Sequence, residues 1–377
     1  MTSAATFHWP DGVRAAASVT FDVDAESAIL ADAPEAAARL SVMTHQAYGP
    51  RTGVPRLLRI LERRGVRATF FVPGHTADRF PDTVRAIRDA GHELGHHGYC
   101  HEPVFRASAE DEETYLLRGL DALDRIAGIR PAGYRAPWWE TTYRTPALLA
   151  RHGFLYDSSL MDADRPYLLD ARDAAEVRDG GPAAGLPLGD RPAGGDRPGR
   201  TGAAPRGVKP PSGSGRAQGG ASGAGHAQGG ALSPALVEIP IQWGLDDWEQ
   251  YGFLPGLTGS GVIESPAKVL EMWALELEAQ VAEGGCFVLT MHPFLTGRAS
   301  RAAALDRLLE RMTAIEGLWI APLVEIAEHV ASLGLPPVRH TQPDVDARPQ
   351  AVARGIATAA EPAPANGPFE DREPSWR

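Results

Sequence analysis

The chain has 377 residues, an apolar fraction of 43% and a formal net charge of −11, with an isoelectric point near 5.6. This size allows one large domain with an insert or tails. The acidic balance argues against binding nucleic acid or an anionic membrane, because both need clustered lysine and arginine.

Short apolar runs alternate with helix-like segments before residue 170 and after residue 235, which predicts a βα pattern. The predicted strands are 15–21, 68–72, 92–94, 132–135, 155–156, 236–239, 286–291 and 318–321. The predicted helices include 55–64, 83–90, 110–126, 145–151, 266–283 and 301–312. A glycine follows most of these helices, where a C-terminal cap is expected. We therefore predict an α/β fold, a distorted (β/α) barrel of seven or eight strands with its reactive residues at the strand ends.

Residues 171–235 have a different composition, rich in Gly, Ala, Pro and Arg, with the near-repeat AQGGASGAGHAQGGA. Such a segment buries too little apolar surface to offset its ordering entropy, so we predict a disordered insert. The tail over 338–377 is predicted to be disordered as well. The barrel domain is then 1–170 together with 236–337.

The cellular compartment is predicted from three negative observations. The first residues lack a basic segment followed by a long apolar one. No run approaches the roughly 18 apolar residues of a spanning helix. Two cysteines, Cys100 and Cys286, cannot form a disulfide framework. We expect a cytoplasmic protein with no membrane partner, and we interpret Cys100 as a small apolar residue rather than a ligand or nucleophile.

The first predicted strand runs directly into two carboxylates in TFDVDAE. Strand alternation points Asp22 and Asp24 to the same side. Two like charges held so close are costly unless a cation lies between them or one is protonated. A divalent metal held by one carboxylate and two imidazoles would resolve the conflict. The alternative is an acidic turn that caps a helix.

The segment AGHELGHHGYCHEP contains two histidine pairs, His92/His96 and His97/His101. The first matches the H-E-x-x-H of zinc proteases, in which both histidines lie on one helix. Here 92–94 is expected to be a strand, and two glycines would each cost a helix about 1 kcal/mol relative to Ala. The second pair starts at the carboxyl end of that strand. It is the better metal candidate, although an isolated pair could be a hydrogen-bonded loop.

Two further strand ends carry reactive side chains. The sequence GYRAPWWE presents Arg135, which could hold a carboxylate ionised, and Trp138 and Trp139, which could wall a pocket or only form an aromatic cluster. The sequence FVLTMHPF delivers His292 to the end of an apolar strand. A single histidine there is more often structural, but four strand ends bearing Asp, His, Arg and His indicate a shared site.

Together the motifs TFDVDAE, HGYCHE, GYRAPWWE, YDSSL and LTMHP resemble the polysaccharide deacetylase superfamily, also called the NodB-homology or carbohydrate esterase family 4 group. The resemblance is greatest to its cytoplasmic branch, with Helicobacter-type peptidoglycan deacetylases and allantoinase-like enzymes. It implies a distorted (β/α) barrel and a divalent metal, usually Zn²⁺. By motif, Asp24, His97 and His101 would be the ligands.

The same resemblance implies the catalytic roles. Asp22 would be the general base, held by Arg135, and His292 the general acid, with Asp157 as the partner that orients it. Two departures from the secreted members are the spaced aspartates and the missing tryptophan after Asp157. Some ureide-hydrolysing members of the cytoplasmic branch work without the usual metal.

Other residues are expected to shape the substrate pocket around Trp138 and Trp139. They are His75 in FFVPGH, Trp243, Asp246, Asp247 and Trp248 in QWGLDDW, and Arg298 in HPFLTGR, which could instead cap a helix. The predicted function is metal-dependent hydrolysis of a non-peptide C–N bond, most simply N-deacetylation of an amino sugar or polysaccharide. The alternatives are an amidohydrolase of a small amide, ureide or cyclic imide, and an inactive carbohydrate-binding protein. Homo-oligomer formation is left open.

Overall fold

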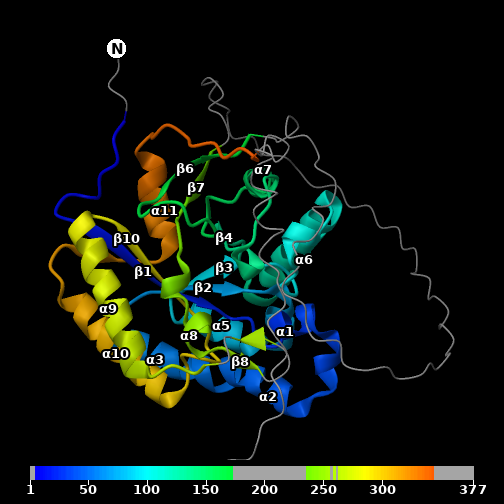
Figure 1. Cartoon of the computed structure of the whole chain (residues 1–377). Coiled ribbons are helices and arrows are strands. Elements are labelled where there is room, and N and C mark those ends of the chain that lie inside the picture. The colour runs from blue at the N-terminus through cyan, green and yellow to red at the C-terminus, as the bar shows by residue number, and fades with distance from the viewer. Residues whose placement is uncertain (1–4, 173–234, 255–257, 260–261, 344–377) are drawn as a thin grey trace, which may run out of the picture. The chain divides into compact units, whose positions relative to one another are not determined.

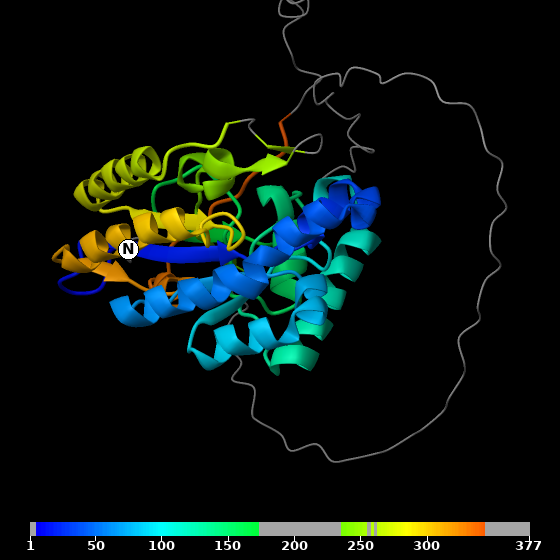
Figure 2. The same ribbon diagram turned by 90° about the horizontal axis from the view of Figure 1, so that it is seen from below.

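The computed structural model describes residues 5–172, 235–254, 258–259 and 262–343. All the helices and strands described lie in one unit, Met1–Arg339. The largest element is a single curved sheet with helices on its outer side (Figures 1 and 2).

Eight strands follow one another in the order β10-β1-β2-β3-β4-β5-β7-β6, and β11 pairs with the first part of β1. Neighbouring strands are parallel except β6 and β7. The strands are β1 (Ala15–Asp22), β2 (Thr69–Val72), β3 (Glu93–His96), β4 (Gly133–Tyr134), β5 (Tyr156–Asp157), β6 (Tyr167–Asp170), β7 (Ala235–Glu238), β10 (Cys286–Met291) and β11 (Leu318–Ile320). A separate hairpin joins β8 (Phe253–Leu254) to β9 (Thr258–Gly259).

Strand β1 lies in the middle of the protein and is buried along its whole length. Its odd-numbered residues, such as Val19 and Phe21, belong to the main hydrophobic core. That core includes residues of the outer helices α3 (Val54–Arg64), α9 (Pro266–Glu283) and α10 (Ala299–Ala314). The side chains of the even-numbered residues point to the opposite face of the sheet, which is the interior of the barrel. Asp22, the last residue of β1, therefore reaches the interior at the carboxyl end of the strand.

The sheet does not close into a complete barrel. Among the described strands, β10 and β6 are the two ends of the order, and neither pairs with the other. A loop residue, Asp246, makes an isolated bridge to Thr290 instead. Near the start of β10, Cys286 N donates to Asp164 O at 2.8 Å. The prediction of a distorted (β/α) barrel is confirmed, with an open seam on the free side of β10.

The remaining helices connect and cover the strands. They are α1 (Ser27–Asp32), α2 (Leu40–Tyr48), α4 (Gly74–Arg79), α5 (Pro81–Asp89), α6 (Ala109–Ala127), α7 (Thr145–Arg151), α8 (Asp247–Tyr251) and α11 (Leu323–Ser332). Helices α3 and α9 end at the predicted glycines Gly65 and Gly284, which adopt φ of 64° and 69°. Within the described part of the chain, no helix is both long and apolar enough to span a bilayer.

The predicted domain boundaries need small corrections. Ala171 is 2% exposed and Ala235 begins β7, so both ends of the predicted insert belong to the fold. Strand β6 was not predicted. Val338, assigned to the tail, accepts a hydrogen bond from Asp170 N at 2.8 Å. The rest of the predicted insert, 173–234, and the tail beyond residue 343 lie outside the described residues.

Candidate active site

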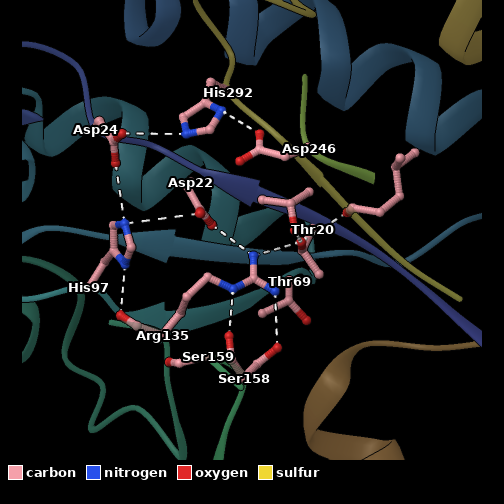
Figure 3. A network of polar contacts seen from close by, with 12 residues as sticks. Thr20, Asp22, Asp24, Thr69, His97, Arg135, Ser158, Ser159, Asp246 and His292 are labelled. Carbon is pink, nitrogen blue, oxygen red and sulfur yellow. Dashed lines mark hydrogen bonds and ion pairs between the residues drawn. The ribbon is translucent and has the colours of Figure 1, made fainter. Parts of the chain in front are cut away.

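Three side chains, Asp24, His97 and His101, converge beyond the carboxyl ends of β1 and β3. Figure 3 shows two of them, Asp24 and His97. His97 Nε2 lies 3.5 Å from Asp24 Oδ1, and His101 Nε2 lies 3.6 Å from Asp24 Oδ2. One potential ligand atom from each residue lies within 4.8 Å of the others, and all three residues are buried. The sequence prediction required such a convergence, and the structure provides it.

Local backbone geometry directs both imidazoles to this point. His97 follows β3 directly, and its Nδ1 contacts Arg135 O at 2.7 Å. A carbonyl oxygen can only accept, so Nδ1 carries a proton, and in the neutral ring the lone pair is on Nε2, which faces Asp24. His101 adopts a left-handed φ of 59°, a conformation uncommon for a residue with a side chain. The tight loop from His97 to His101 thereby returns the second ring to the first.

The donor set fits a divalent metal. Both oxygens of Asp24 are buried and have no hydrogen-bond partner among the described residues, and leaving such a group uncompensated is costly. Burial raises the pKa of Asp24, although the imidazoles of His292 and His97 act in the opposite direction. Burial, helped by the neighbouring His97 and His292, places the pKa of His101 well below its usual value. A neutral imidazole and a carboxylate are the ligand forms that zinc and similar metals require.

Asp22 is held in its ionised form beside this cluster. Burial alone raises its pKa, but Arg135, His97 and His292 outweigh burial and lower it below the usual value. Arg135 Nη1 donates to Asp22 Oδ1 at 2.9 Å, and Asp22 Oδ2 lies 4.0 Å from His97 Nε2. The fully buried guanidinium also donates to Thr20 Oγ1, Ser158 O and Ser158 Oγ. Four polar contacts therefore fix its orientation (Figure 3).

His292 also faces Asp24 (Figure 3), with its Nε2 3.6 Å from Asp24 Oδ2. Its Nδ1 lies 2.7 Å from Asp247 Oδ1 and 3.5 Å from Asp246 Oδ1. Asp247 also accepts from the backbone N–H groups of His292 and Thr296 and from the Thr296 hydroxyl. Burial lowers the pKa of His292, but the Asp247 hydrogen bond and nearby carboxylates raise it overall to about 10. The imidazole is thus protonated at neutral pH.

The residue that orients His292 is Asp247, a correction to the sequence prediction, which gave that role to Asp157. Asp157 lies on β5 and accepts from Ser158 N and Ser159 Oγ. Burial raises its pKa to about 6. Asp247 was predicted to contact substrate, but it is completely buried. The arrangement of the strands explains why Asp247 is the partner of His292. Asp247 follows directly on Asp246, which forms a bridge to Thr290 of β10, the strand that leads to His292. Asp157 ends β5, which is separated from β10 by the strands β1 to β4.

The protease-like pair, His92 and His96, lies away from this centre. The motif forms β3, as predicted, and His96 contacts Leu116 O at 2.9 Å through Nε2. His92 Nδ1 accepts from Ala68 N. Burial lowers the pKa of His96 to about 3 and of His92 to about 4. Both imidazoles are therefore neutral at pH 7, and each forms a hydrogen bond with a backbone group.

Tryptophans surround the convergent cluster. Trp138 lies edge-on to His101, with ring centroids 4.9 Å apart, and Trp248 lies 5.3 Å from His292 in the same manner. Trp139 is buried and stacks on Trp243 at 4.6 Å, and Trp243 is 47% exposed. Trp138 and Trp139 adopt φ of 61° and 57°, and such strain concentrates at functional sites. Asp246 and Trp248, expected to shape the pocket as part of the QWGLDDW segment, both contact His292.

Two further predicted pocket residues belong to α4 and to the start of α10. His75 is half-buried in α4, and burial lowers its pKa. Arg298 is the N-cap residue of α10. Its guanidinium lies over the Tyr48 ring and donates to Phe294 O, and its Nη2 contacts His45 Nδ1. The structure therefore uses Arg298 in packing between α2 and α10.

Comparison with known proteins agrees with this geometry. The family model for polysaccharide deacetylase matches residues 41–156. A peptidoglycan deacetylase of Helicobacter pylori is 30% identical over 284 residues, which cover 74% of this chain and 84% of that protein. The chain belongs to the polysaccharide deacetylase family. This deacetylase-family protein is therefore a hydrolase of non-peptide carbon–nitrogen bonds, as the sequence predicted.

Solved structures give the same result for the fold. A putative polysaccharide deacetylase from Mycobacterium smegmatis matches with 43% identity and a TM-score of 0.73, over 91% of this chain and 99% of that one. An allantoinase matches at 22% identity and a TM-score of 0.61, over 86% of this chain and 93% of that one, and shows the shared fold alone. The small-amide alternative fits the comparisons less well than N-deacetylation of a polysaccharide.

Proposed function

We propose that this deacetylase-family protein removes the acetyl group from N-acetylated amino sugar units of a polysaccharide of the peptidoglycan or chitin type. The observation that carries the proposal is the convergence of Asp24, His97 and His101 between an ionised carboxylate, Asp22, and a protonated imidazole, His292. The names of the relatives, a peptidoglycan deacetylase and a putative polysaccharide deacetylase, support the substrate class.

Asp24, His97 and His101 would hold the metal, for which Zn²⁺ suits the donor set. When bound, a divalent cation supplies an activated water and polarises the amide carbonyl. Asp22 accepts the proton of the attacking water, a role that needs the carboxylate to be ionised. Arg135 keeps it ionised and fixes its direction.

His292 donates a proton to the departing amine. Its raised pKa keeps the ring protonated until the C–N bond breaks, and Asp247 fixes the ring so that Nε2 faces the centre. The base lies 4.0 Å from His97 and the acid lies 3.6 Å from Asp24, so both border the Asp24 cluster. This arrangement allows one proton to be taken up and another to be delivered across a single bound amide.

A substrate screen tests the proposal. Chitooligosaccharides, peptidoglycan fragments, allantoin and cyclic imides are each offered to metal-depleted protein, with and without added Zn²⁺. We expect release of acetate from the sugars only when metal is added, and loss of this activity in Asp22→Asn. Turnover of allantoin or an imide without acetate release would favour the small-amide function, and sugar binding without any turnover would favour the inactive carbohydrate-binding alternative. The cytoplasmic location stays a prediction, which cell fractionation tests.

A further inference from the structure

Two buried acids, Glu238 and Asp157, lie beside the catalytic network and have no part in the reaction steps above. Their Cα atoms are partners in the pairing of β5 with β7, and the residues are 0% and 1% exposed. Two carboxylates held so close inside a protein cannot both be ionised at neutral pH, so the acid pair retains one proton.

The hydrogen bonds of the acid pair place this proton on Glu238. Its Oε1 accepts from Ser159 N at 3.1 Å and from Leu160 N at 2.9 Å. Its Oε2 is buried and accepts no hydrogen bond from the residues that the structure describes, so this oxygen is free to carry the proton. The side chain of Glu238 is hydrogen-bonded to Asp157. Burial and the charge of Asp157 raise the pKa of Glu238 well above its usual value, so Glu238 is the donor and Asp157 the ionised acceptor.

The ionised partner organises the turn that follows β5. Asp157 Oδ1 accepts from Ser158 N at 2.9 Å and from the Ser159 hydroxyl at 2.6 Å. The same Ser159 hydroxyl accepts from Ala136 N at 2.9 Å. Because Glu238 accepts from the next two backbone N–H groups, both acids hold the same turn, residues 158–160.

This turn fixes one side of Arg135 (Figure 3). Arg135 Nε donates to Ser158 O and its Nη2 donates to Ser158 Oγ, both at 3.1 Å. On the catalytic side, Nη1 of Arg135 donates to Asp22 Oδ1 at 2.9 Å. The backbone oxygen of Arg135 also accepts from His97 Nδ1 at 2.7 Å. A displaced turn would therefore shift both the guanidinium that holds the base and the carbonyl that orients a metal-binding imidazole.

We propose that Glu238 and Asp157 are positioning residues that share one proton and, through the turn 158–160, keep Arg135 aligned with the base Asp22. This inference rests on the proposed function, because it requires Asp22 to accept a proton in the reaction. The acid pair acts through Ser158 and Ser159 and not on the substrate. Its loss should therefore slow the chemical step more than it weakens substrate binding.

Kinetics of acetate release from a chitooligosaccharide by the full chain, loaded with Zn²⁺, tests the proposal. In Glu238→Gln the amide nitrogen can donate to Asp157 and the oxygen can accept from the turn, so kcat should stay within about threefold of the wild-type value. Glu238→Ala removes both functions and should lower kcat about tenfold to a hundredfold, with KM little changed.

A matched control separates this effect from general destabilisation. Burial also raises the pKa of Glu93, but the hydrogen bonds of Glu93 go to Thr69, Tyr156 and Val324. Glu93→Ala should therefore retain its kcat. Thermal unfolding and elemental analysis check that each variant is folded and holds its metal at the assay temperature.

Ser159→Ala gives a second test that leaves both acids in place. It removes the hydroxyl that joins Asp157 to Ala136 N, and it should lower kcat about threefold to tenfold. Since Glu238→Ala acts through the same turn, the loss in the double variant should be smaller than the product of the two single losses.

Infrared spectroscopy measures the shared proton without any substrate. At neutral pH the wild-type protein should show the C=O stretch of one more protonated carboxyl group than Glu238→Gln does. Spectra without this difference, or wild-type kcat in both Glu238→Ala and Ser159→Ala, would overturn the inference, as would a kcat of Glu238→Gln as low as that of Glu238→Ala. Absence of acetate release from every sugar by the wild-type protein refutes the proposed function instead, and the infrared comparison then still decides whether the acid pair shares a proton.

Discussion

The contact between His292 and Asp247 gives the sharpest mechanistic prediction. Asp247→Asn keeps a side chain of the same shape, whose amide oxygen can still accept from the ring Nδ1, but it removes a charge 2.7 Å from that atom. Asp247 is completely buried and does not border the Asp24 cluster, so substrate binding should be preserved. The change therefore isolates the influence of one carboxylate on the proton of His292.

The expected magnitude follows from the causes of the shift. The pKa of His292 is raised to about 10, and the hydrogen bond to Asp247 is the largest favourable contribution after the opposing effect of burial. An opposite charge at this range changes a neighbour's pKa by about 1–3 units, or about 1.4–4 kcal/mol. We expect the alkaline limb of the kcat profile to move to lower pH by this amount, because the general acid loses its proton earlier.

The assay is acetate release from a chitooligosaccharide across the pH range, with kcat and KM determined separately at each pH. Asp247→Asn should retain most of its kcat at pH 6 and lose it at pH 9, with KM little changed. Asp246→Asn is the comparison, because Asp246 lies farther, at 3.5 Å from Nδ1, whereas Asp247 also makes the hydrogen bond to the ring. Its limb should move less. An alkaline limb that stays in place in Asp247→Asn would refute the reasoning.

Three further predictions follow from the same geometry. His101→Ala should lower metal affinity more than about 100-fold, measured by elemental analysis after dialysis, while His92→Ala should leave metal content unchanged; the opposite result would restore the protease-like pair. Arg135→Ala leaves Asp22 as a buried carboxylate without its partner, so chemical denaturation should show a loss of about 3–5 kcal/mol, and a change below 1 kcal/mol would contradict the buried ion pair. Burial raises the pKa of Glu238 in the folded protein well above its usual value. Protonated Glu238 therefore stabilises the fold fully at pH values below the pKa of the unfolded chain, about 4.3. This stabilisation is lost as the pH rises through the pKa of the folded protein. Glu238→Gln should therefore reduce the fall in the free energy of unfolding between pH 5 and pH 8 by up to about 1.4 kcal/mol per pH unit, measured by chemical denaturation, and identical pH dependence in the two proteins would exclude a raised pKa.

Much of the barrel could be predicted because its elements are locally encoded. The strand Cys286–Met291 and the helices Thr145–Arg151 and Pro266–Glu283 have the predicted bounds, since apolar periodicity and glycine caps mark them in the chain. Strand β6 was missed because it borders the low-complexity segment and depends on antiparallel pairing with β7. A strand whose partner follows after a long insert has no local signal for its pairing.

The sequence by itself determined that Asp22, Asp24, His97, His101 and His292 follow strands, because each apolar run ends at a reactive side chain. Parallel strands bring their carboxyl ends to one edge, so order along the chain was sufficient to predict that these groups meet. Only the tertiary structure decided that Asp247 rather than Asp157 holds His292, and that Asp157 lies beside Glu238 instead. Both depend on which segments lie next to each other across the incomplete barrel, and that is set by packing between residues far apart in sequence.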